Sequence, residues 1–218
     1  RLGFMDYMLR DYHPHSDRDI VFIPVGINYD RVIEDRTLIR RLDKNVEKRS
    51  VWFILKTTVS FILKNASLSR KNRWRRFGYA SVNFGEPVSA KEYCDVNGVD
   101  FSSLDRDDRF VRVKSLADSI MSNITKVIPI VPTALVSEVL LKNMKEWKSE
   151  LEIKSQCSQR IKQLADAGAP IDVSASAVES VLGSAMGILV GRGLVDVNDN
   201  LYRMKESELD IIKYYANT

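Results

Sequence analysis

A continuous apolar run near the start of the chain gives the clearest strand signal. Residues 20–27 (IVFIPVGI) are apolar without alternation and lie between polar residues. Such a run is typical of a strand that is buried on both faces in a parallel α/β sheet. Pro24 interrupts the run, and proline has no N–H to donate to a neighbouring strand. We therefore expect a strand end, a bulge or a cleft-facing position at Pro24.

Alternating positions predict a second strand over residues 77–88. Residues 79–84 (YASVNF) alternate between two faces, and the sequence Gly85-Glu86-Pro87 closes the segment in a turn. Helical spacing predicts a short amphipathic helix over residues 2–10. A longer helix is favoured over residues 50–65, because this apolar segment contains no Gly or Pro.

The pattern becomes mainly helical from about residue 105. The predicted helices are 107–127, 133–143, about 145–167, a helix capped by Ser174 or Ser176 that runs to about residue 190, and 207–217. Residues 194–197 and 201–204 predict a small β-hairpin around Asn198-Asp199-Asn200. The sequence thus predicts an α/β fold with a mostly parallel sheet flanked by helices over residues 1–104. A helical C-terminal extension with a small β-hairpin follows over residues 105–218.

Charge is concentrated in one segment. The 218 residues are 44% hydrophobic and 28% charged, which excludes disordered and low-complexity classes, and the formal net charge is only +4. Residues 44–76, however, hold ten basic residues and one acid, Glu47, so this segment carries +9 and the remainder carries −5. Such asymmetry indicates an anionic partner, either nucleic acid or an anionic lipid surface.

Apolar and aromatic residues beside these cations are typical of a segment lying on an anionic leaflet. The candidate membrane-binding residues are Trp52, Phe53, Arg70, Lys71, Arg73, Trp74, Arg75 and Arg76. The alternative is a core helix followed by a solvated basic loop. A second alternative is a non-catalytic nucleic-acid-binding module that uses residues 64–76 and the C-terminal hairpin. Against it, residues 168–218 carry a net −3, the wrong sign for binding phosphates.

Catalytic and metal-binding patterns are weak. Cys94 and Cys157 lack Cys or His neighbours at ligand spacing, so free thiols are expected. His13 and His15 are the only histidines and lie in a polar segment that predicts a solvated loop. We expect no metal site and no cofactor. No apolar run approaches the roughly 20 residues of a membrane-spanning helix.

Two segments resemble conserved regions of the bacterial glycerol-3-phosphate acyltransferases. Residues 22–34 (FIPVGINYDRVIE) resemble the fourth conserved block of that family, and residues 79–87 (YASVNFGEP) resemble the strand that follows it. Residues 2–5 fit the segment after the third block. The C-terminal segments 167–170, 191–194 and 214–217 are similar to the tail of the same group.

The resemblance implies transfer of a fatty acyl group from acyl-CoA or acyl carrier protein to glycerol 3-phosphate. The family's catalytic pair is a His-x4-Asp motif ahead of the third block, and neither His13 nor His15 has this spacing. We therefore expect the motif upstream of Arg1, an acyltransferase domain incomplete at its N-terminus, and a chain that is inactive alone. Glycerol 3-phosphate, an acyl thioester as co-substrate and an anionic membrane are the implied partners, with a peripheral position on the cytoplasmic face of the cell membrane.

Only the fourth block supplies site residues by this resemblance. Pro24 and Val25 would shape the wall of the substrate cleft, and Tyr29 and Glu34 would lie at its mouth, where Tyr29 could donate to a phosphate or carbonyl oxygen. The alternatives are structural. Pro24 would end a strand, Tyr29 would be a half-buried packing residue, and Glu34 would pair with Arg31 or Arg36.

Overall fold

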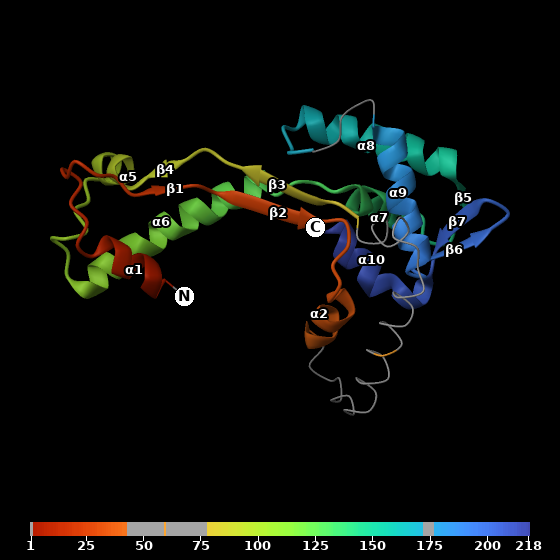
Figure 1. The fold of residues 1–218 in the computed structure, drawn as a ribbon, viewed down its shortest axis with the longest axis horizontal. Helices are drawn as coiled ribbons and strands as arrows, with labels where there is room; N and C mark the ends of the chain where they lie inside the picture. Colours follow the sequence, from red (N-terminus) through yellow and green to blue (C-terminus); the bar gives the residue numbers. More distant parts are fainter. Residues whose placement is uncertain (1, 43–58, 60–77, 172–176) are drawn as a thin grey trace. The chain divides into compact units, whose positions relative to one another are not determined.

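A computed structural model of the chain describes residues 2–42, 59, 78–171 and 177–218 (Figure 1). Its contacts define two compact units. Unit 1 comprises Arg1–Ile27 and Val82–Pro129, and unit 2 comprises Asn28–Ser81 and Ile130–Thr218. These units do not test the domain boundary that the sequence predicts after residue 104, which therefore remains a prediction.

Unit 1 is organised around the helices α1 (Gly3–Leu9), α5 (Ala90–Asn97) and α6 (Arg106–Val127) and a short strand pair. The pair consists of β1 (Val21–Phe22) and β4 (Val88–Ser89). Leu9, Phe101 and Leu116 are fully buried together, and Arg109 of α6 pairs with Asp6 of α1 at 2.9 Å. The side chain of Asp105 accepts two backbone N–H groups at the start of α6, so the predicted helix begins where its cap is.

The strands pair antiparallel, which corrects the expected parallel sheet. The helix and strand mixture is confirmed, but Pro24 splits the apolar run into β1 and β2 (Val25–Tyr29). β1 pairs antiparallel with β4, and β2 pairs with β3 (Ala80–Phe84). Hydrogen bonds from Gly85 N to Pro24 O (2.8 Å) and from Asp30 N to Tyr79 O (3.0 Å) flank this second pair in antiparallel register.

The burial pattern explains why the sequence wrongly predicted a parallel sheet. Gly26 and Asn28 of β2 are buried, whereas Ile27 and Tyr29 are about half exposed, so the apolar run covers one face only. Within the described part of the chain, the parallel pairing is the isolated bridge between Ile130 and Ile171. A strand with an exposed apolar face therefore has the same continuous apolar sequence as a strand that is buried on both faces.

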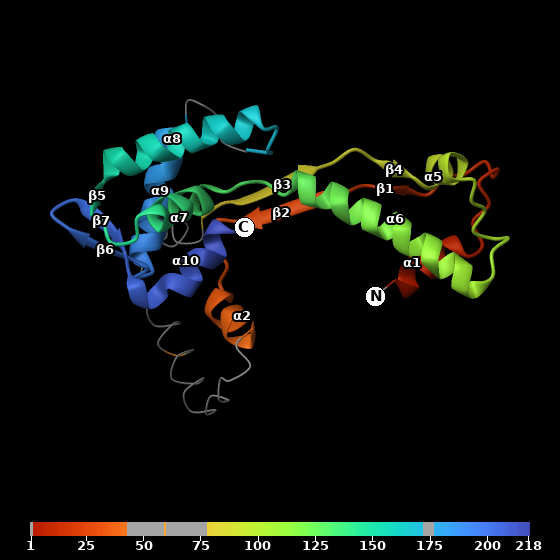
Figure 2. The ribbon, with the colours of Figure 1, turned by 180° about the vertical axis from the view of Figure 1, so that it is seen from behind.

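Unit 2 contains most of the predicted C-terminal helices and the hairpin. Its elements are α2 (Asp35–Leu42), α7 (Pro132–Lys142), β5 (Lys148–Ser149), α8 (Glu150–Asp166), α9 (Val178–Gly191), β6 (Val195–Asn198), β7 (Leu201–Met204), the 3₁₀ turn η1 (Glu206–Glu208) and α10 (Leu209–Ala216). The strands form an antiparallel sheet in the order β5-β7-β6, and these three lie side by side in Figure 1 and in the reverse view of Figure 2. The predicted C-terminal helices and the hairpin are thus present, whereas the extension as a domain over residues 105–218 remains a prediction, since α6 belongs to unit 1.

A local cap decides where α8 begins, whereas the predicted caps of α9 are not described. α8 starts at Glu150, not near residue 145, because Ser149 and Glu152 form a capping box directly after β5. The predicted caps Ser174 and Ser176 lie outside the described residues, and α9 begins after Ala177.

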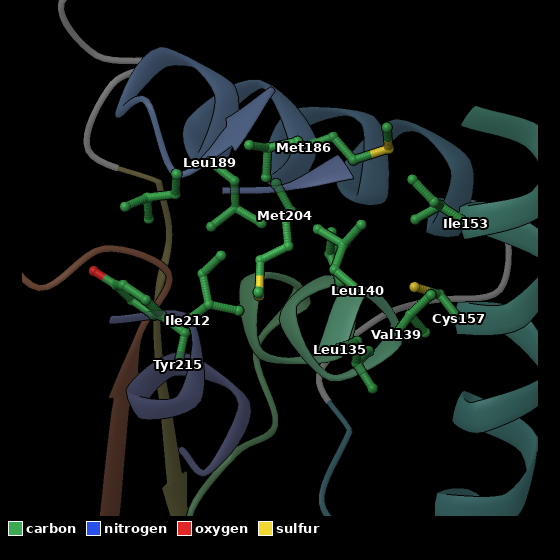
Figure 3. Close-up of a cluster of buried hydrophobic side chains, with 14 of the residues drawn as sticks. Leu135, Val139, Leu140, Ile153, Cys157, Met186, Leu189, Met204, Ile212 and Tyr215 are labelled. Atoms are coloured by element: carbon green, nitrogen blue, oxygen red, sulfur yellow. The ribbon is translucent and has the colours of Figure 1, made fainter. Parts of the chain in front are cut away.

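The core of unit 2 gathers side chains from α7, α8, α9, α10 and the hairpin. Leu140, Leu189, Met204 and Ile212 are almost fully buried and converge in Figure 3. Cys157 joins this core from α8 and Cys94 lies in the core of unit 1, both as free thiols as predicted. Burial raises the pKa of Cys94 to about 11 and that of Cys157 to about 12, so neither is a reactive thiolate near neutral pH.

One hydroxyl in this core is unsatisfied. Ser137 of α7 is 0% exposed, and within the described ranges its Oγ has no hydrogen-bond partner. We expect Ser137→Ala to leave the free energy of unfolding unchanged or to raise it by up to about 1 kcal/mol, because a buried polar atom without a partner is removed. Urea denaturation measures this.

The matched control is Thr133→Val on the same helix. Thr133 is equally buried, but its hydroxyl donates to Asp30 at 3.1 Å, so its removal is expected to cost about 1–3 kcal/mol. A loss above about 1 kcal/mol for Ser137→Ala would contradict the assignment of an unsatisfied hydroxyl.

Candidate functional site

The four site residues taken from the fourth block fall in different units. Pro24 and Val25 belong to unit 1, where Pro24 is buried between β1 and β2 and Val25 begins β2. Tyr29 and Glu34 belong to unit 2. Each pair is therefore described in its own unit, and a role in substrate binding remains a prediction for all four.

Tyr29 and Glu34 border an exposed loop. Tyr29 ends β2 with 47% of its surface exposed, so the structural alternative of a half-buried residue fits its position as well as the functional one does. Glu34 is exposed, and its carbonyl accepts the N–H groups of Thr37 and Leu38 at the start of α2. The suggested partner Arg36 pairs with Glu208 at 3.1 Å.

Two buried carboxylates anchor this loop, and neither was expected from the sequence. Asp30 is 2% exposed and Asp35 is 1% exposed, at the two ends of a segment that joins β2 to α2. A buried carboxylate is stable only when hydrogen bonds or a cation compensate for its lost hydration. The contacts of each are therefore what fixes the loop.

Asp30 caps a helix from a distant part of the chain. Its Oδ1 accepts the N–H (3.2 Å) and the hydroxyl (3.1 Å) of Thr133, and its Oδ2 accepts the N–H of Tyr79 at 3.2 Å. α7 needs this partner because its own N-cap is Val131, which has no side-chain oxygen. Burial raises the pKa of Asp30, and the three hydrogen bonds oppose that rise. A valine at the N-cap position, directly before Pro132, is visible in the sequence and indicates that another segment must supply the cap.

Asp35 lies against a cation and a phenol. Its Oδ2 pairs with the guanidinium of Arg192 and accepts the hydroxyl of Tyr215 at 2.7 Å, while its Oδ1 accepts the N–H of Arg36 at 2.6 Å. The Tyr215 oxygen in turn accepts from Arg192 Nη1 at 2.6 Å. Burial, with Asp35 adding to it, raises the pKa of Tyr215 well above its usual value although Arg192 opposes this, so the phenol stays neutral.

Two further hydrogen bonds connect this part of the chain to α10 and to the residue Thr218 that follows it. The N–H of Val32 donates to the Tyr215 oxygen at 3.1 Å, and Asn28 Nδ2 donates to the carbonyl of Thr218 at 3.2 Å. We call the set of Asp30, Asp35, Thr133, Arg192 and Tyr215 the loop anchor. Its polar groups form two hydrogen-bonded sets, Asp30 with Thr133 and Asp35 with Arg192 and Tyr215. Groups that already bond to one another are suited to hold a conformation and not to attack a substrate.

The histidine segment does not form a catalytic arrangement. Ser102 Oγ lies 2.9 Å from His13 Nδ1 and 2.7 Å from Asp100 Oδ1, so a serine stands between the imidazole and the carboxylate. In a Ser-His-Asp triad the histidine takes the middle place. Among the described residues, no group of three or more His, Cys, Asp or Glu side chains could hold a metal ion.

The candidate membrane-binding residues lie outside the described residues. This applies to Trp52, Phe53, Arg70, Lys71, Arg73, Trp74, Arg75 and Arg76, whose role therefore remains a prediction. None of the helices in the described ranges is both long and apolar enough to cross a membrane.

Comparison with known proteins identifies relatives over most of the chain. Residues 63–218 match the family model of the glycerol-3-phosphate acyltransferase C-terminal region. A glycerol-3-phosphate acyltransferase of Pseudomonas paraeruginosa is 30% identical over 156 residues, which is 69% of this chain and 17% of that protein. One of Pseudomonas syringae pv. tomato is 26% identical over 170 residues, 75% of this chain and 18% of that protein.

A mammalian protein is similar over a shorter segment. The mitochondrial glycerol-3-phosphate acyltransferase 1 of Mus musculus is 30% identical over 95 residues, 44% of this chain and 10% of that protein. The chain thus spans less than a fifth of the length of the relatives it matches.

The close approach of Gly78 to the loop anchor gives a test of its rigidity. Gly78 has φ +69°, and a Cβ placed there would lie 2.5 Å from the Cβ of Asp30. We expect Gly78→Ala to lower the free energy of unfolding by more than the roughly 1 kcal/mol of left-handed backbone strain, because Asp30 must also move. Chemical denaturation measures the difference.

Gly193→Ala is the control in the same unit. Gly193 also has φ +69°, but a Cβ added there would meet no atom within 4 Å beyond its immediate chain neighbours. Its substitution should show the strain alone, about 1 kcal/mol. Equal losses in the free energy of unfolding for the two variants would mean that Asp30 can shift without cost and that the loop anchor is not rigid.

Proposed function

The chain belongs to the family of the glycerol-3-phosphate acyltransferase C-terminal region, and from this premise we propose that it is part of an enzyme that acylates glycerol 3-phosphate. The observation that carries the proposal is the family match over residues 63–218 together with the fourth-block sequence at residues 22–34. The acyl donor would be acyl-CoA or acyl carrier protein, and phospholipid synthesis is the fitting context.

The reaction needs a base that this chain does not supply. A hydroxyl of glycerol 3-phosphate attacks the thioester carbonyl, the new ester forms, and the thiol of the donor leaves with a proton. No His-x4-Asp motif is present among the 218 residues, and the relatives are more than five times longer than the matched part. We propose that the catalytic pair lies in a part of the enzyme outside this chain.

The fourth block would contribute binding and not chemistry. In this proposal Pro24, Val25, Tyr29 and Glu34 each take part in substrate binding, as the resemblance to the fourth block implies. The exposure of Tyr29 and Glu34 supports it, since both side chains are accessible to a substrate. No cofactor is required beyond the acyl thioester, which is a co-substrate.

An anionic membrane is the proposed surface for residues 44–76, with the enzyme held peripherally on the cytoplasmic face. Support comes from the +9 charge and the neighbouring aromatic residues. The alternative is a nucleic-acid-binding module that uses residues 64–76 and the C-terminal hairpin, and the charge around the hairpin disfavours it. Residues 168–218, which include the hairpin, hold seven acidic and four basic residues, and this net −3 has the wrong sign for binding phosphates.

The activity test uses the full-length protein encoded with this chain. We expect release of CoA from palmitoyl-CoA that depends on glycerol 3-phosphate, followed with a thiol reagent, and no turnover by the 218-residue chain alone. Absence of thiol release by the full-length protein with both palmitoyl-CoA and palmitoyl-acyl carrier protein would refute the proposed function. Release with lysophosphatidate but not with glycerol 3-phosphate would refute the acceptor, and turnover by the chain alone would refute the missing catalytic half.

Membrane binding is tested separately by flotation with vesicles of phosphatidylethanolamine and phosphatidylglycerol. We expect replacement of Arg70, Lys71, Arg73, Arg75 and Arg76 by Gln to weaken binding by about tenfold or more, and about 0.5 M salt to have the same effect, because the attraction is electrostatic.

A control variant removes the same charge elsewhere. It replaces the exposed residues Lys91, Lys145, Lys162, Lys205 and Lys213 by Gln. Equal weakening by both variants would assign binding to net charge, and a shift of duplex DNA without vesicle binding would reverse the choice of partner.

A further inference from the structure

The loop between Tyr29 and Glu34 owes its conformation to side chains far away in the sequence. Ile33 is 64% exposed and Glu34 is exposed, so the loop buries little apolar surface of its own. Its fixed points are the backbone N–H of Val32 and the carboxylate of Asp35, and both contact the hydroxyl of Tyr215. These contacts span 183 and 180 residues of sequence.

The hydroxyl of Tyr215 is used to its full capacity. It donates its one proton to Asp35 and accepts from Val32 N and from Arg192 Nη1. Arg192, the residue directly after α9, also pairs with Asp35 at the start of α2. The end of α9, the start of α2 and the loop therefore meet at one hydroxyl of α10. A hydroxyl with one donor and two acceptor positions has none left for a substrate.

The ring of Tyr215 and its hydroxyl have separate surroundings. The ring lies in the core of unit 2, edge-on to Tyr214 at 5.5 Å between centroids, and the hydroxyl points away from that core in Figure 3. Replacement by phenylalanine therefore keeps the ring packing and removes the contacts to the loop together with the hydrogen bond from Arg192. This separation makes a positioning role distinguishable from a role in stability.

We infer that Tyr215 is a positioning residue for acyl transfer, whose hydroxyl fixes the Val32–Asp35 backbone and so sets the places of Tyr29 and Glu34. This inference rests on the proposed function, since it gives the loop a purpose only if Tyr29 and Glu34 meet the substrate. In this role Tyr215 contacts no reacting atom. The C-terminal helix thus acts on substrate binding through the loop.

The contact itself is tested in the 218-residue chain by amide hydrogen exchange. Tyr215→Phe is expected to speed exchange at Val32 by about tenfold or more and to leave the buried amides of α7 unchanged. Tyr214→Phe is the matched control, because in the described part of the structure the hydroxyl of Tyr214 makes no hydrogen bond. Unchanged exchange at Val32, or equal acceleration by Tyr214→Phe, would overturn the inference.

The role is tested in the full-length enzyme by kinetics with glycerol 3-phosphate. Tyr215→Phe is expected to raise KM about tenfold with kcat within about twofold, while Tyr214→Phe matches the wild type. The effect should also be non-additive with Tyr29→Phe, because both changes act on one contact to substrate.

The outcomes separate the two proposals. An inactive wild-type enzyme would refute the proposed function and with it this inference. An active wild type with unchanged KM for Tyr215→Phe would refute the positioning role alone. A loss of thermal stability with equal falls in kcat and kcat/KM would assign Tyr215 a purely structural role and likewise overturn the inference.

Discussion

The buried ion pair between Asp35 and Arg192 is the constraint on which the arrangement of unit 2 depends. Both side chains are largely removed from water, with exposed fractions of 1% and 11%, and Tyr215 bonds to both. Loss of one member of such a pair leaves an uncompensated charge and typically costs about 3–5 kcal/mol. The pair therefore requires α2, α9 and α10 to keep one mutual geometry, which apolar packing alone would fix less strictly.

A second buried carboxylate, that of Asp30, fixes α7 in a similar way. Asp30 completes the first turn of that helix, and α7 is in turn the most buried helix of the unit, with eight buried residues from Pro132 to Leu140. Apolar contacts supply most of the stabilisation of such a helix, whereas the cap determines where it begins. The segment that resembles the fourth block is thus part of the structural framework as well as a candidate binding element.

Local signals were sufficient for much of the fold. Helix α6 begins at its Asp105 cap, next to the predicted start, and the hairpin turns at Asp199 and Asn200, which adopt positive φ as residues of this type readily do. The start of α8 was predicted too early, although its Ser149 capping box is a local signal. Strand direction was not predictable, because an apolar run such as residues 20–27 does not reveal how many faces are covered. The loop anchor was also beyond sequence reasoning, since Asp30 and Asp35 find their partners 103 and 180 residues away.

The separation of Asp35 from Tyr215 has a consequence for synthesis on the ribosome. At about 5–20 residues per second, the 180 residues between them take about 10–40 s to translate. During this interval the carboxylate cannot reach the phenol, and Arg192 is synthesised only shortly before it. The nascent loop must therefore remain hydrated until α9 and α10 emerge, which makes closure of the polar network a late step in the maturation of the protein.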